Sequence, residues 1–112
     1  MNQEVVKLMT IDERLDFIEF RQQLLFDNDK ISRLLFEYEV TKDQYNFIMD
    51  IFDEYSSKVD SEDHLTNGGF EQKIYEVVPQ HKGNYHFAEA LALNFYEADR
   101  WTEVYTKLYG KV

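Results

Sequence analysis

Apolar residues recur along most of this chain in steps of three and four, the spacing of one face of an α-helix. The clearest case is the stripe formed by Ile11, Leu15, Ile18 and Leu25. The same period appears in five further segments, namely 31–38, 45–55, 70–78, 87–95 and 101–108. No alternating pattern of useful length predicts a strand. We therefore expect an all-α fold of about five to six short helices with orthogonal or bundle-like packing in one compact domain.

Capping residues predict where the helices begin. Thr10 to Glu13 and Thr41 to Gln44 have the form of capping boxes, in which two side chains satisfy free N–H groups at a helix start. Asn84 precedes the 87–95 segment, and Asp99 precedes the last one. Each of these residues is expected to cap the helix that follows it.

Proline and glycine predict where helices stop. Pro79 lacks the N–H that a continuing helix needs, and Gly110 is placed to end the last helix. The segment 58–69 has no periodicity and finishes in Asn67-Gly68-Gly69, a strong turn signal. We expect it to be the longest loop.

The length of 112 residues suits a single domain, because two halves would each be too small for a stable core. Residues 1–8 precede the first capping box and are expected to form a poorly ordered N-terminal extension. The helical domain is expected to cover residues 9–112.

The first predicted helix has a second apolar face, formed by Phe17, Phe20 and Leu24 and nearly opposite the first stripe. A surface helix needs only one such face, so the other requires a cover. A neighbouring helix of the same chain would account for it, but we favour a second copy of the protein. Arg14 and Arg21 line one edge and acidic residues the other, as charges do beside a helical seam. The predicted interface is therefore Phe17, Phe20, Leu24, Arg14 and Arg21.

Acidic residues dominate the charge, with 22 Asp or Glu against 12 Lys or Arg and a net charge of -10. Residues 27–63 hold eleven of the acidic residues and four of the basic ones, so seven of the ten excess charges lie there. Such a surface repels nucleic acid and anionic membranes. Asp50, Asp53 and Glu54 mark the predicted acidic surface, and an inhibitor that imitates nucleic acid is the alternative function.

Two further features limit the location. The chain has no cysteine, which excludes disulfide-rich secreted modules and cysteine metal sites. The first nine residues lack the basic and apolar regions of a signal peptide, and no apolar run reaches about 18 residues, the length needed to span a membrane. We expect a cytoplasmic protein.

A cluster of Asp60, Glu62, Asp63 and His64 places possible metal ligands close together. Its spacing matches no EF-hand, which needs Gly at the sixth and Glu at the twelfth position. A solvated acidic loop is the favoured interpretation, and no metal is expected.

His81, His86 and Glu89 are candidates for acid–base chemistry, since His86 and Glu89 lie one helical turn apart. No nucleophile, third ligand or phosphate-binding loop accompanies them. An aromatic-lined ligand cavity stays open as a hypothesis, although helical spacing favours the core for these rings. We expect no enzymatic activity and no cofactor.

The order of elements resembles the YhaI-like family of small uncharacterised helical proteins from Gram-positive bacteria, over about residues 9–109. The resemblance is carried by Ile11, Arg14, Leu15, Ile18, Gln23, Leu24 and Leu25, then Val40-Thr41-Lys42, then Asp53-Glu54-Tyr55, and Gly69-Phe70. It implies a compact helical fold without a catalytic motif. The two apolar faces of the first helix favour a protein-interaction or scaffold module that self-associates, and the net charge of -10 indicates that it binds neither nucleic acid nor membranes.

Overall fold

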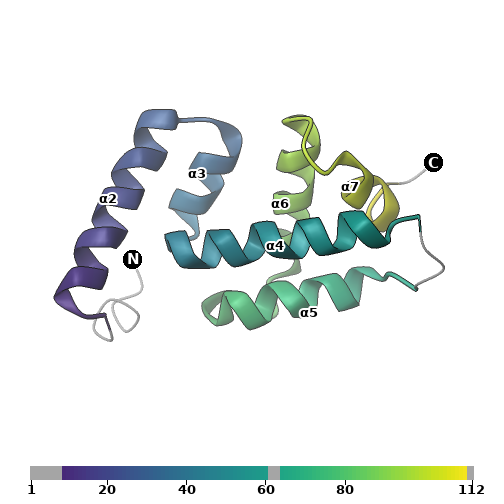
Figure 1. The fold of residues 1–112 in the computed structure, drawn as a ribbon, viewed down its shortest axis with the longest axis horizontal. Coiled ribbons are helices and arrows are strands. Elements are labelled where there is room, and N and C mark those ends of the chain that lie inside the picture. The colour runs from purple at the N-terminus through teal and green to yellow at the C-terminus, as the bar shows by residue number, and fades with distance from the viewer. Residues whose placement is uncertain (1–8, 61–63, 111–112) are drawn as a thin grey trace. The chain divides into compact units, whose positions relative to one another are not determined.

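The computed structural model describes residues 9–60 and 64–110 (Figure 1). In these ranges the chain forms six α-helices and one short 3-10 helix, with no strand, so the all-α prediction is confirmed. In chain order they are α2 (Ile11–Asp27), α3 (Lys30–Glu37), α4 (Lys42–Lys58), α5 (Asn67–Val77), η1 (Pro79–His81), α6 (Tyr85–Glu97) and α7 (Thr102–Leu108). The extension predicted for residues 1–8 lies outside the described residues.

The helices belong to two compact units, and the boundary falls inside α4, between Tyr45 and Asn46. In the first unit, α2 and α3 pack against each other as a helical hairpin. The tight connection depends on Asn28, which takes the left-handed conformation at φ 49°. Asp29 then caps α3 by accepting a 2.7 Å hydrogen bond from the Ser32 N–H. This turn cluster sets how α3 returns along α2.

The second unit is built around an aromatic cluster. Phe52 of α4 lies 5.3 Å from Phe70 of α5 and 4.8 Å from Phe95 of α6, measured between ring centroids in edge-on contacts. The Trp101 ring, just before α7, lies 5.5 Å from Phe52. The three phenylalanines have no exposed surface, so rings drawn from successive helices form the centre of this unit.

Three predicted helix starts are confirmed. Thr10 and Glu13 form the complete capping box of α2, with hydrogen bonds of 3.1 and 3.3 Å. Thr41 and Gln44 form the same reciprocal pair at the start of α4, both at 3.1 Å. Asn84 caps α6 by accepting from the Phe87 N–H. Helix α5 ends at Val77, before Pro79, as expected.

Two boundary predictions are wrong. Asn67-Gly68-Gly69 belongs to the first turn of α5 and not to a loop, because the Thr66 hydroxyl accepts a 3.0 Å hydrogen bond from the Gly69 N–H and caps the helix there. Asp99 does not cap the last helix. Trp101 occupies that position without a side-chain cap, and both residues have positive φ, 62° and 46°.

None of the helices in the described part of the chain combines the length and the apolar character that crossing a bilayer requires.

Candidate functional site

The exposed apolar stripe of α2 is the most prominent surface feature of the first unit. Ile11, Leu15, Ile18 and Leu25 keep 75%, 56%, 52% and 59% of their surface exposed. They lie on one side of a helix of 17 residues, at the spacing noted in the sequence. Single apolar residues are normal on a protein surface, whereas a contiguous row of them marks an interaction site. We call these four residues, together with Gln22, the seam face.

The opposite face of α2 is covered within its own unit. Phe17 and Leu24 are 6% and 5% exposed, and the half-buried ring of Phe20 lies 6.3 Å from that of Tyr45. These three residues were assigned to the predicted interface. The structure instead places Phe17 and Leu24 in the core that α2 shares with α3, and leaves the seam face as the exposed one.

The two arginines of the predicted interface have different surroundings. Arg21 donates a 2.9 Å hydrogen bond to the Phe36 carbonyl, and its guanidinium carbon lies 3.8 Å from the centre of the Phe36 ring. That contact fixes Arg21 against α3. Arg14 is exposed and lies beside the seam face, seven residues earlier on the same helix. The two side chains thus differ in exposure, since that of Arg21 is half-buried.

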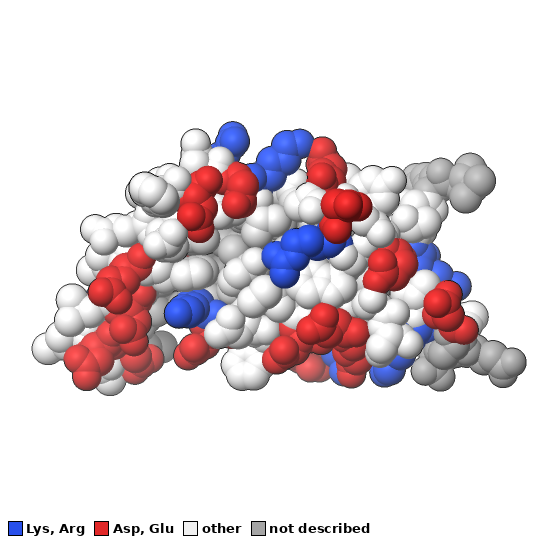
Figure 2. Space-filling model, turned by 45° about the horizontal axis from the view of Figure 1, so that its top comes forward, with Lys and Arg blue, Asp and Glu red and all other residues white. Residues whose placement is uncertain are grey.

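A groove of about 900 Å³ runs along the acidic flank of α2 to the start of α4. Glu13, Asp16 and Glu19 contribute carboxylates to it, while Phe20 and Phe26 contribute apolar surface. Figure 2 shows the acidic side chains that line this end of the molecule, at its left. The groove and the seam face therefore share one helix, and the interaction features of the first unit converge on α2.

The predicted acidic surface of α4 is partly used by the fold. Asp53 accepts a 2.8 Å hydrogen bond from the Trp101 indole N–H. Glu54 lies 3.6 Å from the Lys73 ammonium and 3.8 Å from that of Lys58. Asp50 is exposed on the same helix. Two of the three carboxylates thus have cationic or donor partners within the second unit, which reduces the negative field they present to a partner.

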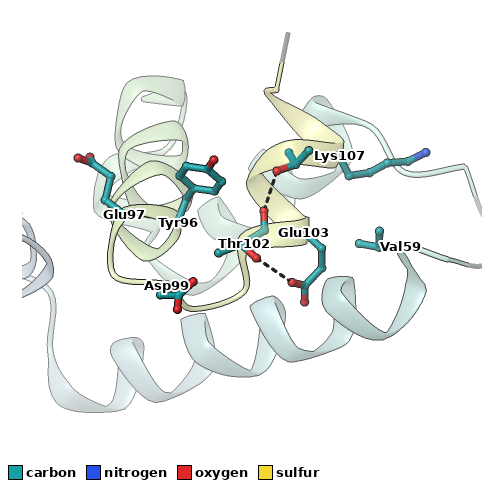
Figure 3. A pocket seen from close by; sticks show the side chains of 8 residues that line it. Val59, Tyr96, Glu97, Asp99, Thr102, Glu103 and Lys107 are labelled. Carbon is teal, nitrogen blue, oxygen red and sulfur yellow. Dashed lines mark hydrogen bonds between the residues drawn. The ribbon is translucent and has the colours of Figure 1, made fainter. Parts of the chain in front are cut away.

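A shallow hollow of about 890 Å³ lies between the end of α6 and α7 (Figure 3). Its charged side chains are Glu97, Asp99, Glu103 and Lys107. Glu103 accepts a hydrogen bond from the Ser56 hydroxyl and another, of 3.5 Å, from Thr102. The bond from Ser56 is the main reason that the pKa of Glu103 lies below its ordinary value. This carboxylate connects α7 to α4, which is a structural role.

The remaining candidates do not assemble into a reactive centre. His81 lies 5.1 Å from the Phe87 ring, and His86 lies 4.1 Å from the Tyr85 ring in a tilted arrangement, measured between ring centroids. Glu62 and Asp63 of the acidic cluster lie outside the described residues. Among the residues that the structure describes, no three His, Asp or Glu side chains come together as metal ligands. A protein-binding surface on α2 is therefore the best-supported candidate site.

No family model, no curated protein and no solved structure matches this chain. The resemblance to the YhaI-like family stays a prediction that rests on the residues quoted for it.

Proposed function

We propose that this protein is a non-enzymatic, cytoplasmic protein-interaction module that self-associates through α2. The observation that carries the proposal is the seam face, where four large aliphatic side chains are each more than half exposed along one helix. Burying such side chains is favourable by roughly 1 kcal/mol for each half-exposed Leu or Ile. A helix that presents four of them gains most from a partner with a similar apolar stripe.

A second copy of the same chain supplies such a stripe without any further assumption. Two-fold pairing places the same patch of both copies in contact, which is the commonest arrangement of soluble oligomers. The contact of two helices is small beside a standard protein interface, so we expect a weak dimer with a dissociation constant in the micromolar range, about 1–100 µM.

The acidic-inhibitor alternative receives less support from the side-chain contacts. It requires carboxylates that face a basic cleft, whereas Asp53 and Glu54 interact with Trp101 and Lys73 of the same unit. The two functions also differ in their dependence on salt. Association through apolar surface changes little as ionic strength rises, and binding that depends on carboxylates weakens strongly.

Sedimentation velocity over a series of protein concentrations tests the proposal. The wild-type chain should shift from monomer to dimer, and Ile18→Lys should remain monomeric while keeping its helical circular dichroism. Phe47→Lys is the matched control, because Phe47 is 58% exposed on α4 and lies outside the seam face. A wild-type chain that stays monomeric throughout, or an Ile18→Lys variant that dimerises like Phe47→Lys, would show the proposal to be wrong.

A further inference from the structure

The seam face has the register of a helix that pairs with another helix. Ile11, Leu15, Ile18, Gln22 and Leu25 follow one another in steps of four, three, four and three. These are the d and a positions of successive heptads, with Ile11 at d and Leu15 at a. Such a narrow stripe, repeated over two heptads, is typical of a coiled-coil seam, whereas helices that cover a globular core carry a broader one.

Charged residues of opposite sign flank the two edges of the seam face. Asp12 and Glu19 occupy the e positions, and Arg14 and Arg21 occupy the g positions. In a parallel pair, each g residue lies beside the e residue of the next heptad on the other helix. In an antiparallel pair, g residues lie beside g residues and e residues beside e residues. Flanking charges of this kind select orientation.

The two orientations differ sharply for this helix. Parallel pairing in register places Arg14 beside Glu19 of the partner subunit, and symmetry provides this pair twice. Antiparallel pairing centred on Ile18 places Arg14 beside Arg21 of the partner subunit and brings the two Glu19 carboxylates together. The first arrangement attracts and the second repels. The charges beside the seam face therefore favour the parallel pair.

Resting on the proposed self-association, we infer that α2 pairs with α2 of a second copy in parallel and in register, with Arg14 facing Glu19 of the partner subunit. Gln22 at an a position supports the register, because an amide in the seam is satisfied best by the same amide of the other helix. Arg21 contributes no comparable pair, because the e position of the next heptad is occupied by Phe26, which has no charge.

Disulfide cross-linking reports the orientation of the two helices directly. The sequence has no cysteine, so each variant carries a single thiol. Ile11→Cys and Leu25→Cys should each cross-link to their own copies in a redox buffer, since parallel in-register pairing brings identical seam positions within disulfide reach. Asp16→Cys is the control, because position 16 lies on the same helix away from the seam. Cross-linked dimer is measured by intact mass and non-reducing electrophoresis.

Antiparallel pairing gives the opposite pattern. The single variants would cross-link poorly and an equal mixture of Ile11→Cys with Leu25→Cys would cross-link well. That result, with dimers still present in sedimentation, overturns the inferred orientation and leaves self-association standing. If Asp16→Cys cross-links as efficiently as Ile11→Cys and Leu25→Cys, the inferred orientation is also wrong. The two helices would then not meet preferentially along the seam face. A monomeric wild type instead refutes the proposed function itself.

A charge exchange tests the Arg14–Glu19 pair independently. Arg14→Glu and Glu19→Arg should each raise the dimer dissociation constant by roughly two- to tenfold, as expected for two exposed ion pairs replaced by repulsion. The double variant should recover wild-type affinity, because the exchanged charges attract again. Asp16→Arg changes the net charge as Glu19→Arg does and should have little effect. Failure of the double variant to recover overturns the pairing of Arg14 with Glu19.

Discussion

The indole N–H of Trp101 donates a hydrogen bond of 2.8 Å to the carboxylate of Asp53, joining the residue that precedes α7 to the middle of α4. Trp101 has a left-handed backbone at φ 46°, which is unusual for a bulky residue and is retained only where the surroundings hold it. Its ring is also held by Phe95, 4.9 Å away between centroids, and by the Arg100 guanidinium, 4.5 Å from the ring centre. Asp53 therefore helps to maintain the entry into α7.

Asp53→Ala should lower the free energy of unfolding by about 1 kcal/mol, because it removes the acceptor of the indole hydrogen bond. Asp50→Ala is the matched control on the exposed part of the same helix, and its effect should be smaller, within about 0.5 kcal/mol. Urea unfolding followed by tryptophan fluorescence measures both. Equal stabilities of the two variants would mean that this hydrogen bond contributes nothing.

Phe17→Ala should destabilise the first unit by about 3 kcal/mol or more, because the ring is buried and its loss leaves a cavity. Ile18→Ala, one residue further along α2, should change the stability of the monomer by no more than about 0.5 kcal/mol, because more than half of that side chain is exposed. Thermal unfolding at a concentration below dimerisation compares the two. The reverse order would mean that the buried and exposed faces of α2 are exchanged.

Gly110→Ala should destabilise the end of α7. A Cβ placed on Gly110 would lie 2.5 Å from the Thr106 carbonyl oxygen, too close for the backbone to accommodate without moving. Gly68→Ala provides a matched control, because a Cβ there meets nothing within 4 Å, and alanine in the first turn of α5 should stabilise by a few tenths of a kcal/mol. Opposite signs in chemical unfolding are the expected outcome.

Glu103→Gln should remove part of the acid sensitivity of folding. The pKa of Glu103 is lowered in the folded chain, chiefly by the Ser56 hydroxyl, from an ordinary value of 4.5. A carboxylate of this kind stabilises the fold fully above its unfolded pKa, and its contribution is lost as the pH falls through the folded pKa.

The stability difference between wild type and Glu103→Gln should therefore be constant above about pH 5 and shrink at lower pH. Ser56→Ala, which removes the donor, should flatten the same part of the profile. Urea unfolding at a series of pH values measures the difference. A difference in unfolding free energy that grows as the pH falls would contradict the assignment of the lowered Glu103 pKa to the Ser56 hydrogen bond.

Tyr109→Phe should make the chain less sensitive to alkali. Burial, and then the 2.7 Å hydrogen bond that its hydroxyl donates to Glu71, raise the pKa of Tyr109 above its ordinary value of 10.0. The phenol therefore contributes stability that is present below pH 10 and declines as the pH rises beyond it. Unfolding measured between about pH 9 and pH 11 should show a steeper loss for wild type than for the variant. Parallel profiles would rule out this contribution.

Local sequence determined most of the helices. Thr10 with Glu13, Thr41 with Gln44, and Asn84 each cap a helix through hydrogen bonds to residues three positions away, so their effect can be predicted without knowing the rest of the fold. Prediction was wrong where two local signals competed. Gly68 and Gly69 indicate a turn, but Thr66 can cap a helix that includes them, and the helix is what forms.

Tertiary structure decided which surface of α2 is exposed. Both faces repeat apolar residues at helical spacing, and periodicity alone cannot rank two faces of similar hydrophobicity. Packing against α3 buries Phe17 and Leu24, and the contact of Arg21 with Phe36 holds that side inward. The seam face is exposed because a hairpin of two helices covers only one side of each. The sequence by itself thus determined that α2 has two apolar faces, although one neighbouring helix can cover only one of them. The position of α3, set by the turn at Asn28 and Asp29, decided which face is buried and which is exposed.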